Sequence, residues 1–249
     1  MTSIKLRPIG SARQALNSFL NFLFPSYCLL CDAPLGVGER IVCGRCWARL
    51  EIITDRFCPK CGALLRKGRA ICASCSKAGY YFSFNRSLGP FDQRYQTLIH
   101  HLKYERMTSL AVRLGEKLLF LLRAEPRFSP AEGIVPVPLH PTKLRERGYN
   151  QSLLLAQEVS RGSGLPLIDD ALQKVRRTKS QTRLTFEERV ENLRGAFRVK
   201  LREKVEGKKL ILIDDVFTTG STLNNCAQAL LEAGACEVYG LTLAIAKGS

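Results

Sequence analysis

The sequence lacks any long apolar run, and this absence excludes a membrane-spanning helix. The most apolar stretch near the N-terminus, Phe19 to Phe24, is short and is interrupted by Asn21, whereas a span needs about 20 apolar residues. A continuous apolar region followed by a small-residue cleavage site is also missing, so no secretory signal is expected. We therefore expect the chain to be cytoplasmic, with its thiols reduced.

Two common phosphate-binding patterns are missing as well. No Lys follows a glycine loop in the G-x4-G-K-[ST] spacing, and the G-x-G-x-x-G pattern does not occur. Walker-type and Rossmann-type phosphate loops are therefore excluded.

Acidic residues are scarce, since 22 Asp and Glu stand against 38 Lys and Arg, for a net charge of +16. The excess is confined to residues 1–200, because residues 201–249 carry 5 basic and 6 acidic side chains. A surplus of this size favours a polyanionic partner, either nucleic acid or a phosphorylated small molecule. The alternative is a basic surface that is only solvated.

Cysteine, in contrast, is concentrated in one region. Four C-x2-C pairs follow one another with 11, 11 and 10 residues between them. Two such pairs complete a tetrahedral site for Zn²⁺, whereas disulfides do not suit the compartment, a redox pair needs one motif, and iron–sulfur clusters use other spacings. The pattern predicts two structural Zn²⁺ sites without an open position, formed by Cys28, Cys31, Cys43, Cys46, Cys58, Cys61, Cys72 and Cys75.

The four pairs form an internal repeat of about thirty residues. The repeat favours sequential pairing, in which the first two pairs share one metal and the last two share the other. A cross-braced arrangement remains open. Basic side chains and aromatics such as Trp47 and Phe57 lie between the pairs, which is compatible with binding single-stranded nucleic acid and equally with aromatics that fill small ribbon cores.

The most informative stretch runs from Leu210 to Thr222. Four apolar residues predict a buried strand, two carboxylates follow at Asp214 and Asp215, and a helical pattern begins near residue 222. Between them, a small-residue loop around a glycine brings backbone amides and hydroxyls to a helix N-terminus, an arrangement that suits a phosphate. One acid is expected to reach sugar hydroxyls, and the other to reach a hydrated Mg²⁺ or a structural partner. The loop consists of Thr218, Thr219, Gly220, Ser221 and Thr222.

Strands alternate with helices through the rest of the chain. We expect strands at 84–88, 134–139 and 237–246, and helices at 12–24, 93–104, 107–123 and 150–160, which predicts a parallel α/β sheet flanked by helices. Ligands bind such sheets beyond the carboxyl ends of the strands. A basic turn after 134–139 is placed there, and it offers cations for a pyrophosphate: Lys143, Arg145 and Arg147. The stretch 177–183 has little apolar patterning and is expected to be a mobile loop or hairpin.

The segment 210–222 resembles the phosphoribosyl diphosphate (PRPP) motif of type I phosphoribosyltransferases. The order of features along nearly the whole chain resembles the ComF family of competence-associated proteins, through the four Cys pairs, LIHHLKY, VPVPLH with RGYNQ, and IDDVFTTGST. This resemblance implies a double zinc ribbon in residues 1–80, joined to a type I phosphoribosyltransferase-like domain in residues 81–249. Phe217 is a small departure, for which we expect no functional effect.

By the same resemblance, the loop from Thr218 to Thr222 holds the 5-phosphate, and Asp214 and Asp215 hold the ribose hydroxyls of PRPP. The family also implies the handling of single-stranded DNA in the cytoplasm during natural transformation, beside a DNA helicase partner. Two functions remain open. The chain is either a DNA-handling protein with a PRPP-binding site, or an active phosphoribosyltransferase in which the acid pair and the three cations Lys143, Arg145 and Arg147 stabilise the reacting centre.

Overall fold

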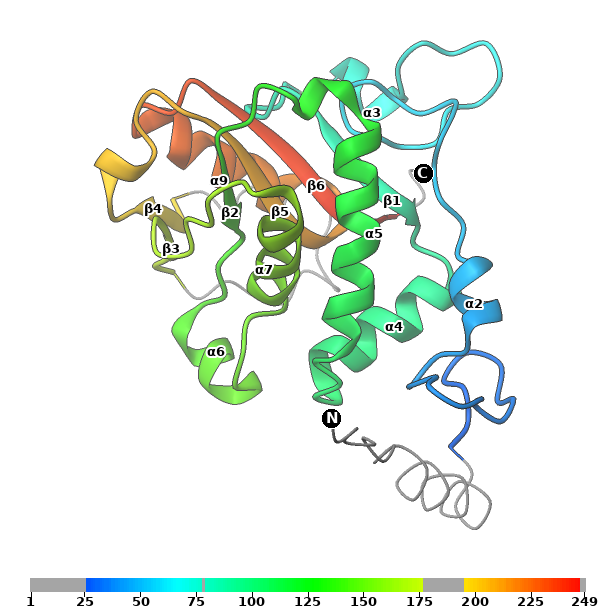
Figure 1. Cartoon of the computed structure of the whole chain (residues 1–249). Helices are drawn as coiled ribbons and strands as arrows, with labels where there is room; N and C mark the ends of the chain where they lie inside the picture. Colours follow the sequence, from blue (N-terminus) through cyan, green and yellow to red (C-terminus); the bar gives the residue numbers. More distant parts are fainter. Residues whose placement is uncertain (1–25, 78, 177–194, 247–249) are drawn as a thin grey trace, which may run out of the picture. The chain divides into compact units, whose positions relative to one another are not determined.

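The computed structural model describes residues 26–77, 79–176 and 195–246, and it consists of two compact units, Met1–Leu50 and Glu51–Ser249 (Figure 1). The predicted helix at 12–24 and the predicted loop at 177–183 lie outside the described residues. The domain division near residue 80 stays a prediction. Within the described ranges, no helix combines the length and apolarity that crossing a membrane requires.

Each unit contains one cysteine ribbon, and the two ribbons repeat the same local structure. In the first unit, the Cys28 amide donates to the Ala33 carbonyl at 2.8 Å, and in the second the Cys58 amide donates to Ala63 at 2.7 Å. Each ribbon then adds a short helix that carries its last cysteine, α2 (Gly44–Ala48) or α3 (Ala73–Lys77). The repeat read from the sequence is therefore a structural repeat with an offset of thirty residues.

The second unit is built on a four-stranded sheet in which all strands are parallel and the order is β1-β6-β5-β2. The strand β2, which ends at Pro136, lies at an edge of the sheet, where a proline without an amide donor is tolerated. The outer side of that strand pairs with a passing segment, because the Ile134 amide donates to Pro166 and the Ile168 amide donates to Ile134. The strands are β1 (Asn85–Pro90), β2 (Gly133–Pro136), β5 (Lys209–Phe217) and β6 (Glu237–Ile245).

Helices cover both faces of this sheet (Figure 1). On one face, α5 lies over β1 and β6 and α7 lies over β2 and β5, whereas α9 covers the other face. The sheet is buried on both sides, which explains the continuous apolar runs of β5 and β6. The helices are α4 (Gln93–Tyr104), α5 (Leu110–Ala124), α6 (Pro141–Arg147), α7 (Gln151–Ser163) and α9 (Ser221–Glu232), with 3-10 turns at Pro126–Phe128 and Arg202–Lys204.

Two elements differ from the sequence predictions. The segment after β2 is the short helix α6 and not a turn, because the His140 ring accepts from the Thr142 amide and Pro141 occupies the first helical turn. Strand β5 continues through both aspartates and ends at Phe217, so the acid pair lies within the strand and not after it. An antiparallel pair, β3 (Leu172–Lys174) with β4 (Phe197–Val199), lies beside α9.

Candidate functional site

The phosphate-type loop connects the carboxyl end of β5 to the first turn of α9. Gly220 is the N-cap of α9, and its φ of 77° is the left-handed conformation that glycine adopts without strain. The Thr219 and Ser221 hydroxyls lie 2.8 Å apart, and Thr218 is exposed. The Ser221 amide donates to the Thr219 hydroxyl at 3.4 Å, and the start of α9 directs the positive end of a helix dipole toward the loop, which favours an anion there.

The two aspartates are buried and both are engaged with the start of α7. The Ser152 hydroxyl donates to Asp214 at 2.9 Å, and the Gln151 side-chain amide donates to Asp215 at 3.0 Å. Asp215 also forms an ion pair with Lys103 at the end of α4. The aspartates are only 8% and 4% exposed. In this structure, the acid pair expected to hold a sugar is held by protein groups.

The surroundings of the two carboxyl groups shift their pKa values in opposite directions. Burial raises the pKa of Asp214 to about 7, and the neighbouring charge of Asp215 adds to the rise. Burial also acts to raise the pKa of Asp215, but the Lys103 ammonium outweighs it and holds this pKa below its ordinary value. Near neutral pH, Asp215 and Lys103 are therefore both charged.

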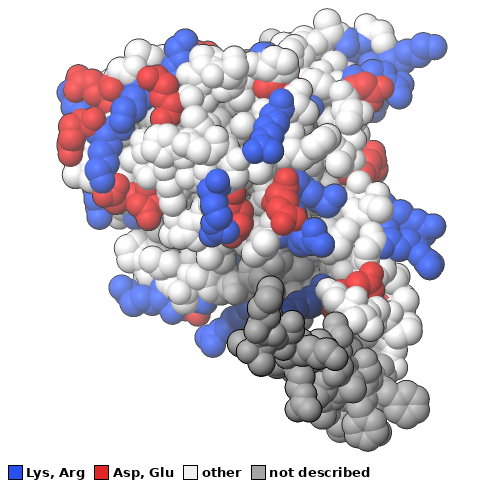
Figure 2. Space-filling model, viewed as in Figure 1, with Lys and Arg blue, Asp and Glu red and all other residues white. Residues whose placement is uncertain are grey.

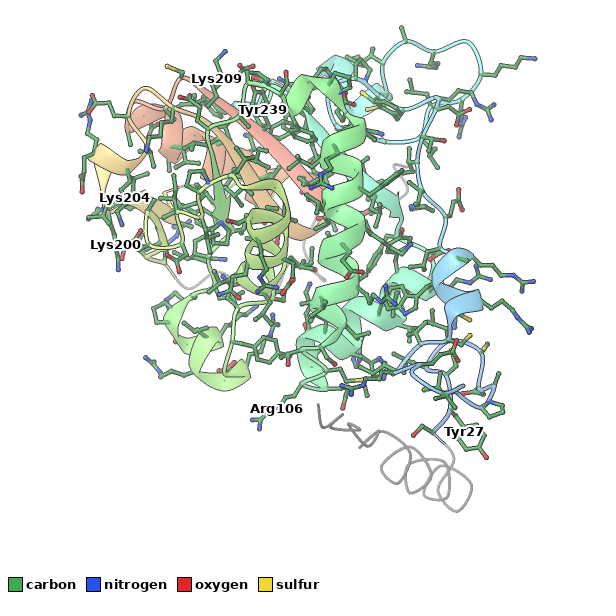
Figure 3. The ribbon with its side chains drawn as sticks, in the orientation of Figure 1. Tyr27, Arg106, Lys200, Lys204, Lys209 and Tyr239 are labelled. Atoms are coloured by element: carbon green, nitrogen blue, oxygen red, sulfur yellow. The ribbon has the colours of Figure 1, made fainter. Side chains whose placement is uncertain are left out.

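A basic cavity of about 280 Å³ lies next to the acid pair, between the end of α4 and the helix α6. Arg106 extends from the turn between α4 and α5 on the side that faces α6 (Figure 3). Four cations and one acid line the cavity, so its net charge favours an anion. The lining residues are Lys103, Tyr104, Arg106, Lys143, Glu146 and Arg147.

The structure brings most of the predicted site residues to this edge of the sheet. Lys143 and Arg147 line the basic cavity, whereas Arg145 is exposed on α6 and is not among the lining residues. Arg147 also donates to the Gln151 side chain and lies 5.1 Å from the centre of the Tyr104 ring. The α6 cations and the β5 acids are thus connected through the first residue of α7.

Three residues of the site were not predicted from the sequence: Arg106, Gln151 and Ser152. For Lys103, the LIHHLKY segment leaves two interpretations open, a solvated lysine and one that reaches an anion, and the structure places it at Asp215 and in the basic cavity. Gln151 is the last residue of RGYNQ, and its neighbour Asn150 caps α7 by accepting from the Ser152 amide at 3.0 Å. For Gln151 and Ser152, the signal is a polar residue at the start of a helix beyond the edge strand β2, where it meets the aspartates of β5.

A bound Mg²⁺ would have to arrive with its ligand. Among residues 26–77, 79–176 and 195–246, the groups of three or more metal-ligating side chains consist of cysteines alone. The buried aspartates form a pair and already have protein partners. Mg²⁺ keeps several waters and is usually held by one or two carboxylates together with phosphate oxygens, so this edge fits a magnesium–diphosphate complex better than a free ion.

The cysteines, in contrast, form two complete four-sulfur clusters, and the sequential pairing is what the structure shows. Within each cluster all sulfurs lie within 4.8 Å of one another. The Cys31 and Cys43 sulfurs are 3.8 Å apart, and those of Cys61 and Cys72 are 3.6 Å apart. Tetrahedral zinc with bonds of about 2.3 Å places its sulfurs about 3.8 Å apart, so both clusters fit Zn²⁺.

Comparisons with known proteins agree with this arrangement. The double zinc ribbon domain family matches residues 19–76, and the phosphoribosyl transferase domain family matches residues 150–249. The DNA utilization protein YhgH of Escherichia coli (strain K12) is 33% identical over 217 residues, which cover 86% of this chain and 94% of that protein. Competence protein F of Haemophilus influenzae is 29% identical over 233 residues, with 91% and 99% covered. Competence protein ComFC of Bacillus subtilis is 30% identical over 237 residues, with 87% and 93% covered.

The relatives match almost from end to end, and the two domain families match in the predicted order. The parallel sheet with helices on both faces and the two four-cysteine ribbons confirm the predicted fold class. On these grounds the chain belongs to the ComF family.

Proposed function

We propose that this chain is a ComF-type competence protein that handles single-stranded DNA in the cytoplasm and binds PRPP at the carboxyl edge of its sheet. One observation supports the ligand site above the others. Lys103 pairs with Asp215 and also lines the basic cavity. The phosphate-type loop, the acid pair that precedes it and a cationic cavity therefore adjoin. In that order, they correspond to the 5-phosphate, the ribose and the diphosphate of PRPP.

The 5-phosphate binds the loop between β5 and α9. Backbone amides of the loop and the Thr219 and Ser221 hydroxyls donate to its oxygens, and the helix dipole adds about half a positive charge. The hydroxyl of Thr218 is exposed and adds a further donor. In this assignment, all the small residues of the loop contribute to binding the 5-phosphate.

The ribose binds the acid pair by an exchange of partners. In the structure Lys103 neutralises Asp215, which keeps a buried carboxylate from being unpaired. When PRPP binds, the Lys103 ammonium moves to the diphosphate, and Asp215 accepts from a ribose hydroxyl. The Gln151 amide stays on Asp215 and holds the carboxylate in place.

The diphosphate occupies the basic cavity beside α6. The cavity has a volume of about 280 Å³, near the lower end of the range for small-molecule sites, about 300–1,000 Å³. Arg106, Lys143 and Arg147 contact its oxygens, and Mg²⁺ that enters with the ligand offsets the remaining negative charge. Arg145 lies on the exposed side of α6 and contributes at longer range.

The DNA-handling role rests on the family and on charge. Relatives are named for competence and for DNA utilization, and the net charge of +16 favours a polyanion. On the face drawn in Figure 2, the basic side chains are spread over many elements and interspersed with acidic ones. We propose that basic side chains contact the DNA backbone, in cooperation with a DNA helicase.

Calorimetry with PRPP and Mg²⁺ tests the ligand site. We expect saturable binding by the zinc-loaded protein and its loss in the double variant Asp214→Asn/Asp215→Asn. The matched control is Asp169→Asn/Asp170→Asn, which changes two adjacent aspartates that are exposed. A flat titration of the folded wild-type chain, or unchanged binding by the first variant, would disprove the site.

An active phosphoribosyltransferase is the second candidate function. It is favoured by a cavity of about 520 Å³ along α4, which shares Lys103 and Tyr104 with the basic cavity and is large enough for a heterocyclic acceptor. In the reaction, the bond from the ribose to the diphosphate breaks and the acceptor nitrogen forms the new bond. A screen of nucleobases for release of pyrophosphate tests this function, and no release with any base argues for binding alone.

A further inference from the structure

The second cysteine ribbon is part of the same apolar core as the residues around the phosphate-type loop. Cys58, Cys61 and Cys75 are buried in one cluster with Phe82, Phe217 and other side chains of the sheet and of α9. The ribbon therefore belongs to the interior of the second unit and is not an appendage on its surface.

On one side, the ribbon is fixed to β1 and to the segment that leads into it. The Lys60 ammonium, between the first two cysteines, donates to the Phe82 carbonyl at 2.5 Å, and the Lys60 carbonyl accepts from the Asn85 amide at 2.8 Å. The Asn85 side chain donates to the Cys61 carbonyl at 3.0 Å. Gly62 has a φ of 79°, and a Cβ there would lie 2.8 Å from the Asn85 carbonyl oxygen. The metal knuckle is thus held directly against the strand.

On the other side, the two residues that follow the ribbon hold the loop and the start of α9. The Tyr80 hydroxyl donates to the Thr219 carbonyl at 3.2 Å, inside the loop. The Tyr81 amide donates to the Asn224 side chain at 2.6 Å, in the first turn of α9. These contacts join positions 139 and 143 residues apart in the sequence.

Three aromatic rings fill the space between the ribbon and the loop. Tyr80 stacks on Phe82 with ring centres 4.7 Å apart, and Phe82 meets Phe217 edge-on at 6.0 Å. A Cβ added at Gly220 would lie 2.5 Å from the Phe217 ring and 3.1 Å from the Tyr80 ring. The back of the loop therefore rests on this cluster, which includes the Phe217 ring.

We propose that the second zinc site, acting through Tyr80 and its aromatic neighbours, positions the phosphate loop for its ligand. Zinc at Cys58, Cys61, Cys72 and Cys75 keeps the ribbon closed, the closed ribbon holds Tyr80, and Tyr80 holds the carbonyl of Thr219. Tyr80 is a positioning residue that does not itself touch the ligand. The inference rests on the proposed function, in that the loop is taken to bind the 5-phosphate of PRPP.

The chain offers a matched comparison, because the first zinc site has the same ligands but belongs to the other compact unit. Cys58→Ser/Cys61→Ser and Cys28→Ser/Cys31→Ser each remove one zinc, which metal analysis of the full chain verifies. We expect the first variant to raise the Kd for PRPP by about fivefold or more, at the lower end of the usual range for coupled sites. The second variant keeps the wild-type Kd. Equal Kd values in the two variants would overturn the proposal.

If the loss of the second zinc unfolds the chain, two less disruptive variants test the positioning role. Tyr80→Phe keeps the ring stacking and both zinc ions but removes the hydroxyl donor, and we expect a roughly two- to tenfold rise in Kd. Tyr81→Phe, at a side chain that is mostly exposed, leaves the Kd unchanged. A wild-type Kd in Tyr80→Phe would contradict the role of this hydrogen bond.

Hydrogen exchange separates a failure of this inference from a failure of the proposed function. If the wild-type chain does not bind PRPP, the proposed function fails, yet the link between zinc and loop still predicts local exchange. Amides of residues 218–224 should exchange faster in Cys58→Ser/Cys61→Ser and in Tyr80→Phe than in the two controls. Unchanged exchange of this segment in both test variants would refute the positioning role, whatever the ligand.

Discussion

Lys103 and Asp215 form an ion pair whose halves differ in exposure, because the lysine side chain is 21% exposed and the aspartate side chain is 5% exposed. The Asp215 carboxylate also accepts from Gln151. A buried carboxylate with a single cation is costly to leave unpaired. The stability of this site therefore depends on the Lys103 side chain, which also lines the basic cavity.

Replacement of Lys103 by Met should destabilise the chain and weaken PRPP binding together. We expect a loss of about 2–4 kcal/mol in the free energy of unfolding, less than for a fully buried pair because the lysine is partly exposed. Urea unfolding at pH 7 measures the loss, and calorimetry measures the binding. Lys204→Met is the control, since its pair with Asp170 is about half exposed and should contribute less than about 1 kcal/mol. Equal losses in the two variants would argue against a special role for Lys103.

Glu125 provides a second test at the scale of single residues, through the pH dependence of stability. Its carboxylate lies 3.2 Å from buried Arg86 and 2.8 Å from Arg127, and hydrogen bonds from Arg127 lower its pKa despite burial. A depressed folded pKa contributes stability above the unfolded value of about 4.3, and this contribution is lost as the pH falls through the folded pKa.

The variant Glu125→Gln should therefore be less stable than the wild type by about 3–5 kcal/mol at pH 7, because Arg86 loses its buried partner. The difference should shrink as the pH falls below about 4. Unfolding curves between pH 3 and 7, with Glu116→Gln at an exposed pair as the control, measure it. A difference that does not vary with pH would contradict this account.

At the scale of elements, the regular parts of the fold could be predicted from periodicity. The helix expected at 93–104 has those bounds in α4, and the strand expected at 237–246 is β6. The start of α6 was missed because its helix signals, a capping His140 and Pro141, look the same as those of a turn. Such local patterns identify elements, whereas side-chain pairing across them needs the tertiary structure.

The candidate site likewise has some parts that could be predicted from the sequence and others that could not. The loop, the acid pair and the cysteines lie in contiguous motifs and could be identified from the sequence. The pairing of Lys103 and Gln151 with Asp215 was not predicted, because the three residues come from elements far apart in the chain. Packing of the second ribbon on β1 was not predictable either, since the contacts of Lys60 and Asn85 are mostly with backbone groups that any sequence provides.

The connection between α6 and α7 should control the position of α4. The Tyr149 hydroxyl donates to the Leu102 carbonyl at 2.5 Å, next to Lys103. Tyr149→Phe leaves this carbonyl without its partner, and we expect a loss of about 1 kcal/mol in stability together with a roughly two- to tenfold rise in the Kd for PRPP. Calorimetry and urea unfolding check it, beside Tyr81→Phe as the control. An unchanged Kd would show that α4 is held in place by its core contacts alone.

At the scale of the whole molecule, charge is the property that bears on DNA. Lys and Arg exceed Asp and Glu by 16 in the chain, and the excess lies in the first two hundred residues. Contacts between Lys or Arg side chains and DNA phosphates release counter-ions, so the affinity for DNA falls as salt is added. A site that reads bases by stacking alone would depend much less on salt.

Binding of single-stranded DNA should therefore weaken steeply with ionic strength. For about five phosphate contacts, the plot of log K against log salt should have a slope near −3.5. Fluorescence anisotropy with a labelled oligothymidine between about 50 and 200 mM salt measures the slope, because the Debye length changes strongly in this range. A slope close to zero, or no binding at the lowest salt, would contradict the DNA-handling proposal.

The position of the second ribbon inside the core also matters while the chain is being made. Tyr80 leaves the ribosome 139 residues before its partner Thr219, an interval of roughly 7–28 s at ordinary rates of translation. Until then, the thiols of residues 58–75 have no sheet to shelter them from oxidants. Early capture of zinc would protect those thiols, so growth under metal starvation should reduce the yield of native protein from each round of translation.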